Sequence, residues 1–143
     1  MMVKQISVFL ENKAGRLASV PRVLGNAGIN IRALSIADTS DFGILRLIVN
    51  DPPRAYQILK ESGYTVSETE VMAVRVPDSP GGLAGVLEVM AEAGINIEYL
   101  YAFIGTTSED ALVIFKVENV DEAAKLFIAK GIQFLEDKEV YAL

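Results

Sequence analysis

The sequence contains no cysteine and no histidine. Disulfides, thiol nucleophiles, zinc sites and histidine-based acid–base catalysis are therefore excluded. The acidic residues form no DxDxDG-like loop, the usual signature of a calcium site. Any catalytic activity would have to rest on lysine, arginine, tyrosine, serine and carboxylate side chains alone. We therefore expect a protein that is not an enzyme and that uses no cofactor.

Long apolar runs and basic clusters are also missing. No run approaches the roughly 18 apolar residues of a membrane span. The N-terminal stretch MMVKQISVFLENK has neither the apolar run nor the small-residue cleavage site of a signal peptide. The net charge is −6 and the lysines and arginines are scattered, so nucleic acid and anionic membranes are poor partners. These observations predict a cytoplasmic protein.

What the sequence does contain is a repeat. The stretch NKAGRLASVPRVLGNAGINIRAL (12–34) returns as DSPGGLAGVLEVMAEAGINIEYL (78–100), and 11 of the 23 aligned positions are identical. Each copy places one asparagine, Asn30 or Asn96, between two isoleucines. A small protein that repeats a motif of this length is built from two related units.

Apolar periodicity assigns the same order of elements to both copies. Alternation at every second residue predicts strands, and an apolar face at helical spacing predicts helices that begin at Asp51 and Asn119 caps. In the first copy the predicted strands are 4–11, 29–38, 44–50 and 64–68, with helices from 17 to Gly28 and from 52 to Gly63. In the second copy the strands are 70–76, 95–104, 111–117 and 132–136, with helices 83–93 and 120–130.

This order predicts an α+β protein made of two ferredoxin-like βαββαβ units in tandem, with antiparallel sheets and helices on one face. We expect the first domain at 1–69 and the second at 70–143. The segment 139–143 (EVYAL) echoes 70–74 (EVMAV), so we expect an extra C-terminal strand that pairs with another strand of the sheet.

Two features of each copy suggest a ligand. The glycine-containing loop that enters the first helix leaves helix N–H groups without internal partners, and these suit a carboxylate. The asparagine amide that begins the second strand offers one acceptor and two donors, enough to hold both ends of an amino-acid backbone. Two simpler interpretations stay open at this point: Gly15, Gly81 and Gly82 as turn glycines, and the asparagines as partners for backbone groups.

The loop, the helix and the Gly-Ile-Asn-Ile motif together resemble the ACT domain. The second copy has the family's Asp-x-Pro-Gly-x-Leu loop, whereas the first has Asn12 for Asp and Ala14 for Pro. The resemblance covers nearly the whole chain. The chain as a whole is similar to the small free-standing tandem ACT proteins. It implies a protein that senses small molecules, most often amino acids, at an interface between ACT units.

Carried over residue by residue, the resemblance implies two ligand sites. The site of the first copy would comprise Asn12, Ala14, Gly15, Arg16, Leu17, Asn30 and Ile31. The site of the second copy would comprise Asp78, Pro80, Gly81, Gly82, Leu83, Asn96 and Ile97. Lys13 and Arg16 make the first loop basic, so the two sites should differ in affinity or ligand.

The main hypothesis is a non-catalytic amino-acid sensor, a homodimer, that regulates amino-acid metabolism through a metabolic enzyme partner. The alternative is a regulatory or interaction subunit that binds an enzyme without a ligand of its own, through its sheet edge or the aromatic stripe Tyr99, Tyr101 and Phe103. An enzyme with an unrecognised site is the third hypothesis, which the missing histidine and cysteine disfavour.

Overall fold

The computed structural model describes residues 2–38, 41–105 and 110–143. The chain divides into two compact units. The first unit comprises Lys4–Thr69 with Tyr141–Leu143, and the second comprises Glu70–Val140 with the N-terminal residues through Val3. Within the described ranges no helix is long and apolar enough to cross a membrane.

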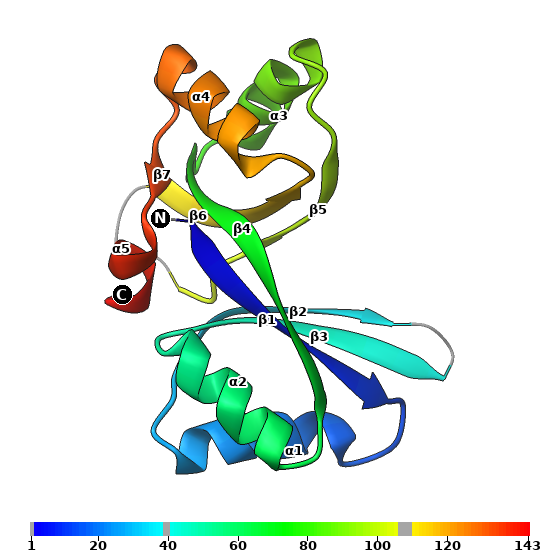
Figure 1. The fold of residues 1–143 in the computed structure, drawn as a ribbon. Coiled ribbons are helices and arrows are strands. Elements are labelled where there is room, and N and C mark those ends of the chain that lie inside the picture. The colour runs from blue at the N-terminus through cyan, green and yellow to red at the C-terminus, as the bar shows by residue number, and fades with distance from the viewer. Residues whose placement is uncertain (1, 39–40, 106–109) are drawn as a thin grey trace. The chain divides into compact units, whose positions relative to one another are not determined.

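The described residues of the first unit form two helices and four strands (Figure 1). Its elements are β1 (Val3–Glu11), α1 (Arg16–Asn26), β2 (Ile31–Asp38), β3 (Phe42–Val49), α2 (Pro52–Glu61) and the beginning of β4 (Thr65–Pro77). The strands follow the order β2-β3-β1-β4, and β3 pairs antiparallel with both β1 and β2. Strand β2 is therefore the outer strand on one side of this sheet.

The core of the first unit explains this arrangement. Alternate residues of β1 and β3, such as Ile6 and Leu47, are buried on one face of the sheet. The apolar faces of α1 and α2 supply Val20, Leu24 and Leu59 to the same cluster. Both helices therefore cover the face of the sheet that carries this apolar cluster.

The second unit repeats the plan. It contains the end of β4, then α3 (Gly82–Glu92), β5 (Ile97–Ala102), β6 (Asp110–Val117), α4 (Val120–Lys130), β7 (Phe134–Leu135) and α5 (Asp137–Tyr141). The strand order is β7-β4-β6-β5, with antiparallel pairing throughout, so β5 is the outer strand. Met90 of α3 and Phe127 of α4 pack with Phe115 of β6 in its core. The predicted fold class is confirmed.

Helix ends follow the sequence signals. The Asp51 carboxylate accepts a hydrogen bond from the Arg54 N–H at 3.3 Å, and the Asn119 Oδ1 accepts one from the Glu122 N–H at 3.0 Å. Gly63 and Gly131 have φ of 91° and 73°, the left-handed conformation that favours glycine after a helix. These predicted caps are therefore confirmed.

Several strand predictions differ from the structure. The second strand of each unit begins after its asparagine, at Ile31 and at Ile97. The segments 64–68 and 70–76 form one continuous strand, β4, and the predicted strand 132–136 is reduced to Phe134–Leu135. The predicted C-terminal strand at 139–143 is wrong, because residues Asp137–Tyr141 form the short helix α5. The Glu139 carboxylate accepts a hydrogen bond from the Glu136 N–H, and Val140 is fully buried, so one helical turn satisfies this segment.

Candidate functional site

The repeated loop occupies the same position in both units, between the first strand and the first helix. Gly15 and Gly81 are left-handed, with φ of 87° and 83°, and they stand at the N-caps of α1 and α3. Neither helix has a side-chain cap there. The Arg16 N–H donates to the Lys13 carbonyl and the Gly82 N–H donates to the Ser79 carbonyl. An anion at either loop would therefore be bound by the helix N–H groups that follow these two.

The two loops differ in charge and in shape. In the first loop, Glu11 contacts Lys13 at 2.9 Å and Arg16 at 3.9 Å. The hydrogen bond from Lys13 and the charges of Lys13 and Arg16 lower the pKa of the exposed Glu11 carboxyl. In the second loop, a Cβ atom on Gly82 would lie 2.0 Å from the Pro77 carbonyl oxygen, so this position requires glycine. The first loop is charged, and the second is tightly folded.

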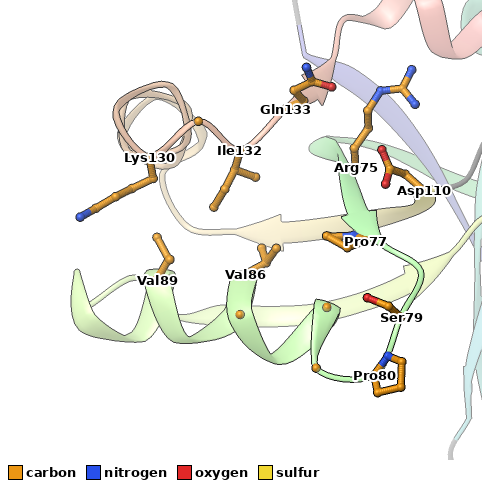
Figure 2. Close-up of a pocket in the computed structure, with 14 residues that line it drawn as sticks. Arg75, Pro77, Ser79, Pro80, Val86, Val89, Asp110, Lys130, Ile132 and Gln133 are labelled. Carbon is orange, nitrogen blue, oxygen red and sulfur yellow. The ribbon is translucent and has the colours of Figure 1, made fainter.

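A cavity of about 620 Å³ opens beside the second loop, between α3 and the residues that follow α4 (Figure 2). Figure 2 shows Val86 and Val89 of α3 facing Ile132, with the Arg75 and Asp110 side chains next to each other at the far side. The predicted residues Pro80, Gly81 and Gly82 line it. The cavity thus combines an apolar wall with charged groups and the loop backbone.

The first unit has a cavity at the equivalent position, but it measures only about 290 Å³. Arg16 lines it at the position of Gly82, and Tyr64 lines it at the position of Ile132. Larger side chains therefore occupy the space that the second unit leaves open. The other side of the first loop forms a further cavity of about 230 Å³, lined by Asn12 and Leu17 together with Ile36 of β2.

The two asparagines lie far from the loops of their own units. Asn30 and Asn96 follow the C-terminal ends of α1 and α3, whereas the loops precede the N-terminal ends. An 11-residue helix separates them in each unit, a length of roughly 16 Å. Asn96 lines a cavity of about 470 Å³ with Glu118, Asn119 and Glu122. One small ligand cannot touch the loop and the asparagine of the same unit.

The backbone of Asn30 is hydrogen-bonded to Asn50, the residue that follows β3. The Asn30 N–H donates to the Asn50 Oδ1 at 3.0 Å, and the Asn50 N–H donates to the Asn30 carbonyl at 3.2 Å. Ile31 and Ile97 pack against the cores of their units. Their side chains thus serve the fold, and a ligand at these positions would contact backbone.

Sequence reasoning missed several residues of the cavity beside the second loop. Arg75, Asp110, Lys130 and Gln133 line it from β4, β6, α4 and the segment before β7. No motif marks them, but their equivalents in the repeat, such as Phe9 and Phe42, line the corresponding cavity of the first unit. A position-by-position comparison of the two copies could therefore have identified these lining residues.

Other arrangements of chemical interest are limited. Among the residues that the structure describes, no three acidic, histidine or cysteine side chains are grouped to hold a metal ion. The rings of Tyr99 and Tyr101 stack at 6.4 Å, and Tyr101 and Phe103 are buried. The aromatic stripe therefore contributes mainly to packing.

Comparison with known proteins gives a consistent assignment. A protein-family model described as an ACT domain pair matches residues 1–143. The crystal structure of protein BT0572 from Bacteroides thetaiotaomicron has 40% sequence identity and a TM-score of 0.93, covering 100% of this chain and 98% of that one. No curated protein sequence matches the chain.

Two more distant structures share the fold. The regulatory subunit of aspartate kinase from Thermus thermophilus, in its ligand-free form, has 20% identity and a TM-score of 0.63, covering 90% of this chain and 93% of that one. The regulatory subunit from Thermus flavus has 19% identity and a TM-score of 0.64, covering 90% of each chain. At these identities the likeness concerns the fold alone.

Proposed function

Because the chain belongs to the ACT domain family and carries the domain as a pair, we propose that it is a non-catalytic regulatory protein that binds an amino acid where two ACT units meet. The observation that carries this proposal is the separation of each loop from its own asparagine by the length of a helix. A second unit, packed the opposite way round, would bring its asparagine to the loop and complete the site.

The chemistry of the parts suits an amino acid. The helix N–H groups and Lys13 at the first loop would bind a carboxylate. Asn96 and the neighbouring Glu118 line one cavity and would bind an ammonium group. The exposed Leu17 and Ile36 beside the first loop would contact an apolar side chain. The sequence contains no histidine or cysteine, which supports a binding role over catalysis.

The experiment is a thermal-shift screen of the full chain against the standard amino acids. A ligand present at roughly 100 times its Kd should raise the free energy of unfolding by about 2.7 kcal/mol. Asn96→Ala should remove that shift, whereas Lys125→Ala on the exposed side of α4 should retain it. If no amino acid shifts the wild-type protein, the ligand part of the proposal fails.

The second candidate is a regulatory subunit that binds a metabolic enzyme without any ligand. Exposed apolar side chains on the outer strands, Leu34 and Ile36 of β2 and Leu100 of β5, favour a protein contact there. Capture of a stoichiometric enzyme partner, unaffected by amino acids and by Asn96→Ala, would favour this candidate over the sensor.

A further inference from the structure

The second unit leaves open a space that the first unit fills with side chains. Gly85 of α3 corresponds to Ser19 of α1, and Ile132 after α4 corresponds to Tyr64 after α2. The hydroxyl groups of Ser19 and Tyr64 are hydrogen-bonded to each other and so bridge α1 and the segment that follows α2. Glycine and isoleucine cannot form this bridge. The cavity of the second unit measures about 620 Å³, against about 290 Å³ in the first.

The fold does not require glycine at position 85. An added Cβ atom there would have no atom within 4 Å apart from its own helix backbone and chain neighbours, and the backbone is not left-handed. Glycine inside a helix is also less stable than alanine. Gly82 differs, because the Pro77 carbonyl leaves no room for a side chain. Gly85 thus has no packing role, and the effect of its missing side chain is a wider cavity.

The wall of this cavity is apolar along α3. Val86 and Val89 face Ile132 across the opening (Figure 2). Val86 is almost fully buried, whereas Val89 and Ile132 are only partly buried and keep exposed apolar surface. A short branched hydrocarbon chain placed between them would bury this surface on both sides, which is favourable.

Polar groups gather at the end of the cavity beside the second loop. Figure 2 shows Arg75, Asp110 and Ser79 at this end, and Lys130 at the other. The lining thus has two basic side chains and one acidic one, and this balance favours an anion. The Arg75 guanidinium and the Ser79 hydroxyl both suit a carboxylate, and the helix N–H groups that follow Gly82 strengthen that preference.

We propose that this cavity binds a small aliphatic carboxylic acid, wholly within the second unit. The carboxylate lies at the end that holds Arg75 and Ser79, and the hydrocarbon chain extends between Val89 and Ile132. In the first unit, Tyr64 lines the corresponding and smaller space. The two copies of the repeat have therefore diverged, one filled by its own side chains and one open to a ligand.

This site differs from the one under the proposed function, because the two sides of each loop are separate. In the first unit, Arg16 lines one cavity with Tyr64, whereas Leu17 lines another with Ile36 of β2. The proposed amino-acid site uses the side of Leu17. The carboxylic-acid site uses the opposite side, where Gly82 stands at the position of Arg16. It needs no second ACT unit, so it goes beyond the proposed function and does not rest on it.

The test is a titration of the full chain, labelled with nitrogen-15, with isovalerate as the probe. The backbone amide signals of Gly82, Gly85 and Gly131, which line the cavity, should shift with a Kd of about 1 mM or tighter. Acetate lacks the hydrocarbon chain and 3-methylbutanol lacks the carboxylate, so each should bind about tenfold more weakly or worse.

Valine separates two sources of the same chemistry, since it is isovalerate with an added ammonium group. Tighter binding of valine than of isovalerate in this cavity would show that the ligand is an amino acid whose ammonium group meets Asp110. Tighter binding of isovalerate would show that the ligand is a carboxylic acid without an amino group. Both results support the site, provided that filling the cavity abolishes the binding.

The cavity is filled by the double change Gly85→Ser and Ile132→Tyr, which copies the pair in the first unit. Isovalerate binding should fall at least about tenfold, while the melting temperature stays the same or rises. As a second variant, Arg75→Gln removes a charge and should weaken isovalerate about tenfold without changing the weak binding of 3-methylbutanol. A merely structural role of Arg75 would affect both compounds alike.

Asn96→Ala is the control, because Asn96 lines a different cavity, and it should leave isovalerate binding unchanged. The inference is overturned if no signal of the three glycines moves with isovalerate or valine at about 10 mM. Binding that survives in a folded double variant would overturn it as well. An amino-acid response that Asn96→Ala removes and the double variant retains belongs to the proposed function alone, so the two proposals fail separately.

Discussion

At the scale of single residues, a methyl group should act in opposite ways at two glycines of α3. Gly82→Ala would set a Cβ atom 2.0 Å from the Pro77 carbonyl oxygen, so the loop must move, and we expect a loss of about 1–3 kcal/mol in the free energy of unfolding. At Gly85, in the same helix, an added Cβ atom would have no atom within 4 Å apart from its own helix backbone and chain neighbours. Gly85→Ala should therefore raise the free energy of unfolding by up to about 1 kcal/mol.

Urea unfolding of both variants measures the two effects, with Gly85→Ala as the matched control. Equal effects at the two positions would contradict the close approach of Pro77 to Gly82. The sequence predicts the capping roles of Asp51 and Asn119, because a cap is a local pattern. It does not predict the contact at Gly82, since that depends on the path of the loop.

At the scale of elements, Pro21 distinguishes α1 from α3. It lies inside α1 at the position that Leu87 occupies in α3. Proline removes one helical hydrogen bond and crowds the preceding turn, at a cost of roughly 3 kcal/mol in an ordinary helix interior. We therefore expect Pro21→Leu to raise the free energy of unfolding by about 1–3 kcal/mol.

Differential scanning calorimetry of Pro21→Leu beside Leu87→Pro tests this expectation. Leu87→Pro should lower the stability by a similar or larger amount. A lower melting temperature for Pro21→Leu would mean that α1 has adapted to its proline.

Elements with strong periodicity were predicted well, and short ones were not. Helices α1 and α2 end near their predicted glycines, Gly28 and Gly63, because the apolar face and the left-handed glycine agree. At 139–143 only a short apolar run was available, and such a run does not distinguish a strand from a helical turn. In the structure, the hydrogen bond from the Glu136 N–H to the Glu139 carboxylate stabilises a helical turn there.

At the scale of the whole molecule, the C-terminal residues contribute to both units. Val140 is fully buried in the second unit, whereas Tyr141–Leu143 belong to the first. In a chain that ends at Glu139, the free energy of unfolding should fall by about 1.5–3 kcal/mol, because the buried Val140 side chain is lost. It also loses the hydrogen bond from the Lys4 N–H to the Tyr141 hydroxyl.

Calorimetry of this truncated chain is the measurement, and removal of the half-exposed Leu143 alone is the control, with little change expected. An unchanged melting temperature after the longer truncation would show that α5 is dispensable for the fold.

The sequence predicted the repeat and the ACT pair, and the family assignment is confirmed. The ligand-binding role of the two loops stays a prediction. The motifs grouped each loop with the asparagine of its own copy, and the structure separates the two by an 11-residue helix. Reading the motifs in sequence order does not show that the loop and the asparagine lie at opposite ends of α1 or α3, so that the two motifs of one unit are kept apart. Charged lining residues such as Arg75 and Asp110 carry no local signal at all.

The two units also exchange parts of the chain. Residues through Val3 belong to the second unit, Tyr141–Leu143 belong to the first, and β4 runs through the boundary at Thr69 and Glu70. A gene divided at that boundary would encode two polypeptides that each lack a piece held by the other. Although the halves are copies of one unit, recombination can therefore move them intact only as a pair.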